Sequence, residues 1–216
     1  MHAAGFGTQP TMLQWGIAID TAPSMTAVRT PLHTRTIRLD GFAREDGLFD
    51  IEARLTDIKH YDLPGWSIGP LPAGQPMHDM VVTMTVDLEG TIRAFEARTE
   101  AGPHQVCRVG AAHFDRLAGL SISKGFLKRA TERIGGVEGC THIRELLQQM
   151  ATVAFQSLRE ARIKRYATEP DRRPPLIDSC IAWSAAGEWV RVRFPAFYTG
   201  PQAAGSAHDD ETAASR

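Results

Sequence analysis

Alternating apolar and polar residues dominate the first half of the chain. Ile37 and Leu39 alternate with charged neighbours, and residues 49–55 carry an apolar side chain at every second position. Because successive side chains of a strand point to opposite faces, both stretches predict strands with one buried face. The turn sequence Arg-Glu-Asp-Gly at residues 44–47 predicts that these strands pair as an antiparallel hairpin.

A second hairpin is expected after a long loop. Residues 63–77 contain seven prolines and glycines, which predicts a loop in which Trp66 covers a pocket or folds back on the sheet. The stretches 81–87 and 91–99 then predict two strands, and the Leu-Glu-Gly sequence at 88–90 predicts the turn between them.

Helical periodicity replaces this alternation in the second half. Between residues 143 and 161, apolar side chains recur at steps of three and four, which is the spacing of one helix face. Thr141 is the predicted N-cap of this long helix, and Pro170 sets its outer limit. Two shorter helices are predicted at residues 108–117 and 123–134.

The order of these elements predicts an α+β fold, with an antiparallel sheet of hairpins and a C-terminal helical layer packed on one face. Residues 1–31 show no sustained period and predict an irregular N-terminal arm. Residues 32–198 are expected to form a single domain, which apolar runs within residues 176–194 close as a third hairpin. The small, polar residues 199–216 predict a disordered tail.

Composition excludes several classes of function. The chain has 216 residues and a formal net charge of −1, so no overall positive field attracts nucleic acid or an acidic membrane. It contains no apolar run of about eighteen residues that would span a membrane. Three scattered cysteines do not form a disulfide framework, and the cytoplasm is the expected compartment.

Three residues suited to metal binding each stand just before a regular element. His78 precedes a core strand, Cys107 precedes the first short helix, and Cys140 precedes the long helix. If these element ends meet at one edge of the sheet, an imidazole and two thiolates would suit zinc or iron. His142, Asp79 or a water molecule would complete the ligand set.

The thiols also allow a simpler interpretation. Cys140 follows a glycine-rich turn at residues 135–139, and the free N–H groups of the helix start would favour its thiolate. Alternatively, Cys140 is a small buried apolar residue and His142 a solvated residue of the first turn. Cys180 is expected to be structural.

Two aspartates are candidate acid–base groups. Strict alternation would place Asp57 and Lys59 on the inward face beside Leu55, as a buried pair or as part of a pocket. The alternative is that the strand ends or bulges there, so that both side chains reach water. Counting back by twos from the core residues of the next strand places His78 inward and Asp79 outward. In a metal-dependent enzyme, Asp79 or Asp57 would serve as the acid or base.

Several short motifs follow one another in a specific order. They are Arg44-Glu45-Asp46-Gly47, Ala53 to Lys59, His78-Asp79-Met80, Cys107, and Gly139-Cys140-Thr141-His142 followed by Arg144-Glu145-Leu146. In this order they resemble a bacterial family of unknown function, domain-of-unknown-function family 2889. The resemblance covers roughly residues 34–158 and implies no established activity.

The same segment has a more distant resemblance to the U-type iron–sulfur cluster scaffolds. Those proteins place a Cys-Gly-Asp before a strand pair, a second Cys before a helix and a third Cys before a last helix. His78-Asp79-Met80, Cys107 and Cys140 stand in these places here. The resemblance implies cluster or persulfide transfer to a protein partner. His78 in place of the first Cys departs from the pattern and leaves metal binding open.

Three functions therefore compete. The first is a metal-binding protein, or a metal-dependent enzyme acting on a small molecule, and the second is an iron–sulfur cluster or persulfide scaffold. The third is a non-catalytic binding module whose thiols only pack. Nucleotide binding is not indicated, because neither the G-x-x-x-x-G-K-[ST] nor the G-x-G-x-x-G pattern occurs.

Overall fold

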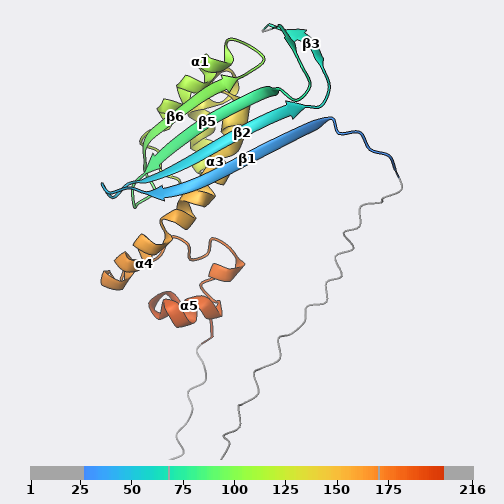
Figure 1. The fold of residues 1–216 in the computed structure, drawn as a ribbon. Coiled ribbons are helices and arrows are strands. Elements are labelled where there is room, and N and C mark those ends of the chain that lie inside the picture. Colours follow the sequence, from blue (N-terminus) through green and yellow to red (C-terminus); the bar gives the residue numbers. More distant parts are fainter. Residues whose placement is uncertain (1–26, 68, 170, 202–216) are drawn as a thin grey trace, which may run out of the picture.

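A four-stranded antiparallel sheet forms one layer of the molecule. The computed structural model describes residues 27–67, 69–169 and 171–201. The strands β1 (His33–Ala43), β2 (Phe49–Lys59), β5 (Pro76–Val86) and β6 (Ile92–Ala101) pair in the order β1-β2-β5-β6. Each pair of neighbours is antiparallel, so the sheet is a meander of two hairpins, as expected. The predicted α+β class is confirmed (Figure 1).

The long loop before β5 contains a small second sheet. Strands β3 (Leu63–Trp66) and β4 (Gly69–Leu71) pair antiparallel within the stretch that the sequence predicts to be irregular. Gly65 and Gly69 have φ values of 123° and 92°, in the region that favours glycine, so they allow this ribbon to turn tightly.

Alternation along the central strands produces the core. Ile51 and Leu55 on β2 and Met80 and Met84 on β5 are fully buried on the inner face. The outer face carries polar pairs instead, such as Arg54 with Asp79. One apolar face and one solvated face are typical of an antiparallel sheet covered on one side.

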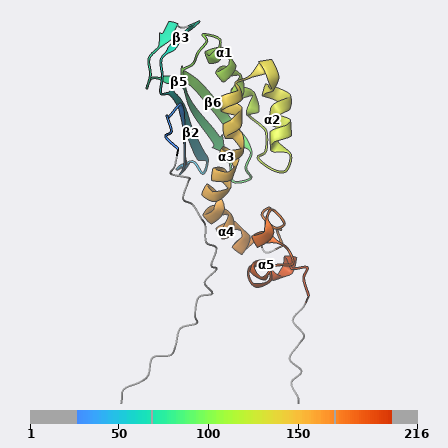
Figure 2. The ribbon, with the colours of Figure 1, turned by 90° about the vertical axis from the view of Figure 1, so that its right-hand side faces the viewer.

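Helices cover the inner face of this sheet, as Figures 1 and 2 show. They are α1 (Cys107–Ala112), α2 (Phe126–Ile134) and α3 (Thr141–Ser157), with 3₁₀ turns at His113–Leu117 and Gly136–Glu138, whereas α4 (Arg159–Thr168) lies beyond the end of the sheet (Figures 1 and 2). The central helix α3 contributes Ile143, Leu146, Leu147, Met150 and Ala154 to the core. Among the described residues, no helix is long and apolar enough to cross a membrane.

Close packing brings α3 directly onto the edge strand β1. A Cβ atom at Gly41 would lie 2.0 Å from the Ser157 hydroxyl oxygen and 3.4 Å from Val153. Glycine at this position therefore lets the helix approach the strand backbone.

The predicted long helix is divided at Leu158. Thr141 is its first helical residue and Cys140 the N-cap, one residue earlier than predicted. The Ser157 hydroxyl donates a hydrogen bond of 2.9 Å to the Val153 carbonyl. Such back-bonding by serine bends helices, and α4 departs from α3 in a new direction (Figure 2).

The predicted hairpin at residues 176–194 is wrong. This segment forms a 3₁₀ turn at Ile181–Trp183, helix α5 (Glu188–Arg193) and a second 3₁₀ turn at Pro195–Phe197. Asp178 organises it, because its backbone N–H donates to the Trp183 carbonyl and its carboxylate accepts from the Ala185 N–H, each at 2.8 Å. The apolar residues of the segment pack into a second small cluster around Ile177, Ala185 and Val190.

The chain ends lie mostly outside the described residues. The expected irregular arm covers residues 1–31, of which only 27–31 are described, and these contain no helix or strand. Of the expected tail, residues 202–216 are likewise outside the described part.

Candidate metal centre

A polar cluster lies at one end of the inner sheet face, where β1 begins, β2 ends and β5 begins. It contains Asp57, His78 and His142, whose ligand atoms all lie within 4.8 Å of one another. Among the described residues, this is the group of His, Cys, Asp and Glu side chains that brings three donors within reach of one ion. The ribbon of β3 and β4 lies beside this end of the sheet (Figure 1).

Strand register delivers the first part of the cluster. Arg35 on β1 lies opposite Asp57 on β2, and Asp57 lies opposite His78 on β5. Directly opposed residues of antiparallel strands point to the same face. Three strands that are adjacent in the sheet, β1, β2 and β5, therefore place a guanidinium, a carboxylate and an imidazole side by side.

Helix α3 delivers the second part. Cys140 is its N-cap in an extended conformation, with φ −102° and ψ 127°, and His142 is the second helical residue. Both are partly buried. The start of the helix thus faces the end of the sheet with a thiol and an imidazole.

The buried carboxylate of Asp57 is held by several donors. The side chain is 1% exposed, and Arg35 donates from Nε and Nη2 to its two oxygens at 2.8 Å each. His33 Nε2 and His78 Nδ1 each approach a carboxylate oxygen at 3.1 Å. Arg35 also binds Glu145 of α3 at 2.6 Å.

These contacts set the ionisation of the aspartate. Burial alone would raise the pKa of Asp57, but the hydrogen bonds and charge of Arg35, with the nearby His78 and His33, outweigh burial and lower it. The same hydrogen bonds raise the pKa of Arg35. Asp57 is therefore a carboxylate at neutral pH.

The two imidazoles lie close together and are neutral at neutral pH. The ring centroids of His78 and His142 are 3.9 Å apart, with planes tilted by 35°. Burial, reinforced for His78 by His142 and for His142 by Arg35, lowers the pKa of both rings below the usual 6.5. Neutral imidazole is the form that binds a metal ion.

Neighbouring groups orient the donors. His142 Nε2 lies 3.9 Å from Asp57 Oδ2, while its Nδ1 lies 3.8 Å from Cys140 Sγ. If Nδ1 carries the proton, the Nε2 lone pair faces the cluster. Metal-binding histidines and carboxylates generally have such partners on their far side, and Arg35 occupies that place for Asp57.

Sequence reasoning named four of the residues that meet here: His78, Cys140, His142 and Asp57. It named Asp57 as part of a buried pair or pocket and as an acid or base, but not as a metal ligand, whereas the structure groups its carboxylate with the two imidazoles as a candidate ligand. The alternative predicts a bulge here, and the register does shift between Asp57 and Ile58. Its expectation that Asp57 reaches water is wrong, because the side chain is only 1% exposed.

Two other predicted residues lie apart from the cluster. Cys107 begins α1, near Gly102 and Thr99, and is not among the three grouped donors. Asp79 lies on the outer sheet face, as alternation predicts, and Arg54 binds both of its oxygens at 2.9 and 2.6 Å. Its carboxylate therefore does not point toward His78 and His142.

Arg35 and His33 are the functional candidates that the sequence analysis missed. Arg35 stands two residues before Ile37, so strict alternation already places it on the inner face. That signal becomes specific only with the pairing register, which brings Arg35 opposite Asp57.

Comparison with known proteins gives a family but no activity. The family model described as "Protein of unknown function (DUF2889)" matches residues 33–156, which is more than half of the 216-residue chain. No protein with a curated description and no solved structure matches the chain significantly. The matched range contains the whole cluster, from His33 to Glu145.

Proposed function

The chain belongs to the DUF2889 family, and we propose that it binds one zinc or iron(II) ion through Asp57, His78 and His142. One observation carries this proposal: the three donor atoms lie within 4.8 Å of one another, with Asp57 and His78 buried and His142 partly buried. Two neutral imidazoles and one carboxylate match known three-residue sites for zinc and for non-haem iron.

Three protein ligands would leave coordination positions for water or a small molecule. Sites of this kind are usually catalytic, whereas structural zinc sites are closed by four protein ligands. The ion would supply Lewis acidity and an activated water. The finer proposal is therefore a metal-dependent enzyme acting on a small molecule in the cytoplasm, with Arg35 and Cys140 positioning the ligands.

Metal titration of the whole protein tests the binding proposal. Chelator-treated protein is titrated with Zn²⁺ by calorimetry, and with Fe²⁺ without oxygen. We expect one equivalent to bind. H78A and H142A should each weaken binding by more than the roughly 10–100-fold typical for loss of a residue that only orients a ligand.

His60→Ala is the matched control. His60 is an exposed imidazole just beyond β2, hydrogen-bonded to Thr34, and it is not one of the three grouped donors. The variant should bind metal as the unaltered protein does. Equal affinities for unaltered protein, H78A and H142A would refute the site, as would the absence of stoichiometric binding.

The iron–sulfur scaffold alternative is less well supported. It requires Cys107 to join His78 and Cys140, whereas the grouped donors are Asp57, His78 and His142. A labile-sulfide absorption spectrum in the purified protein, lost in C107A and C140A but not in H142A, would favour the scaffold instead.

A further inference from the structure

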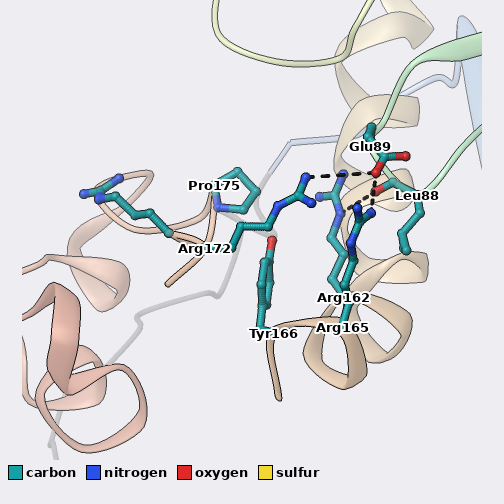
Figure 3. A pocket seen from close by; sticks show the side chains of 8 residues that line it. Leu88, Glu89, Arg162, Arg165, Tyr166, Arg172 and Pro175 are labelled. Carbon is teal, nitrogen blue, oxygen red and sulfur yellow. Dashed lines mark hydrogen bonds and ion pairs between the residues drawn. The ribbon is translucent and has the colours of Figure 1, made fainter. Parts of the chain in front are cut away.

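A polar pocket lies just beyond the end of β5, whereas the cluster of Asp57, His78 and His142 lies near the start of that strand. It has a volume of about 170 Å³ and is lined by residues from the β5–β6 turn, α4 and the segment after α4: Leu88, Glu89, Arg162, Arg165, Tyr166, Arg172, Arg173 and Pro175. Four arginines and one glutamate thus contribute to the lining of a single small cavity, and Figure 3 shows the guanidinium groups of Arg162, Arg165 and Arg172 gathered beside Glu89.

Most of these arginines already have carboxylate partners. Arg165 binds Glu89 and lies 3.0 Å from Glu169. Arg172 lies 3.1 Å from Glu169 and 4.0 Å from Glu89. Arg173 binds Asp178 outside the lining. These contacts fix the positions of the guanidinium groups.

Arg162 is different. Its side chain is 93% buried, with 7% exposed, and its Nε donates to the Leu88 carbonyl at 2.9 Å. Its Nη1 atom is buried without a hydrogen-bond partner among the described residues. The Phe155 ring lies 5.4 Å from the guanidinium carbon and packs against it.

A buried unpaired guanidinium N–H requires an explanation. Burial lowers the pKa of Arg162, because loss of hydration penalises the charged form, yet arginine remains protonated in proteins. Its positive charge is therefore buried with an unused donor. Buried charges are normally paired, so an anion bound in the pocket that Arg162 lines would compensate this buried charge.

The size and chemistry of the pocket indicate which anion. A volume of about 170 Å³ is below the ~300–1,000 Å³ typical of pockets that enclose drug-sized ligands. Arginine forks match the geometry of phosphate oxygens, and charge-assisted hydrogen bonds of this kind are strong. We propose that this arginine pocket, formed by Arg162, Arg165, Arg172 and Arg173, binds one phosphate-class oxyanion.

The oxyanion has two possible sources, inorganic phosphate and a phosphate ester. A larger cavity of about 910 Å³ adjoins the arginine pocket, since both are lined by Glu89, Arg162 and Pro175. Its lining includes Phe155 and Trp183. An ester could place its phosphate in the small pocket and its apolar part in the larger cavity.

Titration of the metal-free full-length protein with inorganic phosphate tests the inference. We expect saturable one-to-one binding by calorimetry and ³¹P NMR. R162Q and R172A should each weaken it at least about tenfold, because each removes a charged donor. Arg172 is 43% exposed, so R172A tests the pocket even if R162Q fails to fold.

Arg159→Ala is the matched control for charge. Arg159 is an exposed residue of the same helix that lines the larger cavity but not the arginine pocket. R159A and H142A should keep the affinity for phosphate. The proposal is overturned if phosphate does not saturate a site, or if R159A weakens binding as much as R172A does.

A parallel titration with phenyl phosphate identifies the source. Tighter binding than inorganic phosphate, lost together with phosphate binding in R172A, assigns the pocket to phosphate esters. Equal affinity assigns it to the free anion. Either outcome supports the shared oxyanion site, and neither depends on the metal cluster.

Discussion

Asp57 illustrates how single residues determine the chemistry of the cluster. Its carboxylate is buried, and it is held by Arg35 from one neighbouring strand and by His78 from the other. Removal of Arg35 would leave this buried carboxylate without its main charged partner, although Arg35 itself is 33% exposed. The carboxylate is therefore fixed in position before any ion binds, and the two imidazoles remain neutral donors beside it.

The metal-free protein should lose stability as the pH falls below about 6.5. The folded-state pKa values of His78 and His142 are lowered, so below 6.5 the unfolded chain binds more protons than the folded chain. The free energy of unfolding therefore decreases as the pH is lowered, by at most about 1.4 kcal/mol per pH unit for each group. The decline continues until the folded-state pKa values are passed.

Urea unfolding at pH 7.5, 6.5 and 5.5 measures this effect. The H78A/H142A double variant should show a shallower decline, whereas H60A should retain it. Asp57 does not contribute to this pH dependence. Because its pKa is lowered in the folded protein, its contribution to the free energy of unfolding changes only below the ordinary pKa of 3.8. Parallel pH profiles for the unaltered protein and the double variant would contradict the expectation.

At the scale of single residues, the sequence predicted which face of the sheet a side chain points to better than it predicted which residue that side chain contacts. Alternation placed His78 inward and Asp79 outward, and both side chains lie as expected. It could not identify Arg35, because the residue that faces Asp57 depends on how two strands align. The prediction for Cys107 had a different weakness. Its position at the start of a helix does not determine how far that helix lies from His78 in space.

The start of α3 is the element on which the cluster most depends. Gly139 directly precedes Cys140, and a Cβ atom at this position would lie 2.5 Å from the Ile134 carbonyl oxygen and 3.2 Å from the Phe114 ring. The backbone of α2 therefore limits where α3 can begin. Both elements must keep their positions for His142 to reach Asp57.

Gly139→Ala should disturb the cluster from outside it. The clash involves a backbone oxygen, so the start of α3 must shift, which costs about 1–3 kcal/mol. Because Cys140 and His142 move with the helix, zinc affinity should fall about tenfold or more. Urea unfolding and calorimetry measure the two effects.

Gly110→Ala is the control for this variant. A Cβ there would lie 3.5 Å or more from Gly139 and Cys140, an ordinary contact, and Gly110 is helical. Alanine in a helix should be neutral or stabilising by about 0.5–1 kcal/mol. Equal zinc affinity in G139A and G110A would show that the start of α3 has room to move.

Periodicity identified most elements correctly but failed after α4. In each of the four main strands and in helices α2 and α3, the apolar residues follow a single spacing over the whole element, either every second residue or every third to fourth residue. Residues 176–194 contain short apolar runs, which fit a strand and a buried turn equally well. The contacts that decide the outcome are those of Asp178, with φ 67°, and periodicity does not report them.

At the scale of the molecule, the buried apolar side chains of the described residues form two separate groups. The large one joins the sheet to α1, α2 and α3, and the small one joins Ile177, Ala185 and Val190. The family match ends at residue 156, within α3. The cluster of Asp57, His78 and His142 therefore lies within the matched part, and the arginine pocket lies mostly after it.

Val190→Ala should destabilise the small group selectively. Val190 is fully buried there, and its truncation should cost about 2 kcal/mol. Hydrogen exchange should accelerate at amides of residues 177–197 while those of β2 and β5 keep their protection, because the two groups share no side chains.

Leu147→Ala provides the comparison. Leu147 is fully buried in the large group, and its truncation should cost about 2–5 kcal/mol. Exchange should then accelerate throughout the sheet. Uniform acceleration in both variants would show that the chain unfolds as one cooperative unit.

The cluster draws its donors from positions 57, 78 and 142, on two strands and a helix. An ion held there would act as a reversible cross-link between segments that separate when the chain unfolds, so its binding energy would add to folding stability. Protein prepared with a chelator would then melt at a lower temperature than protein prepared without one, although the sequence is identical. The melting temperature measured for a sample would therefore depend on whether the metal had been removed during purification.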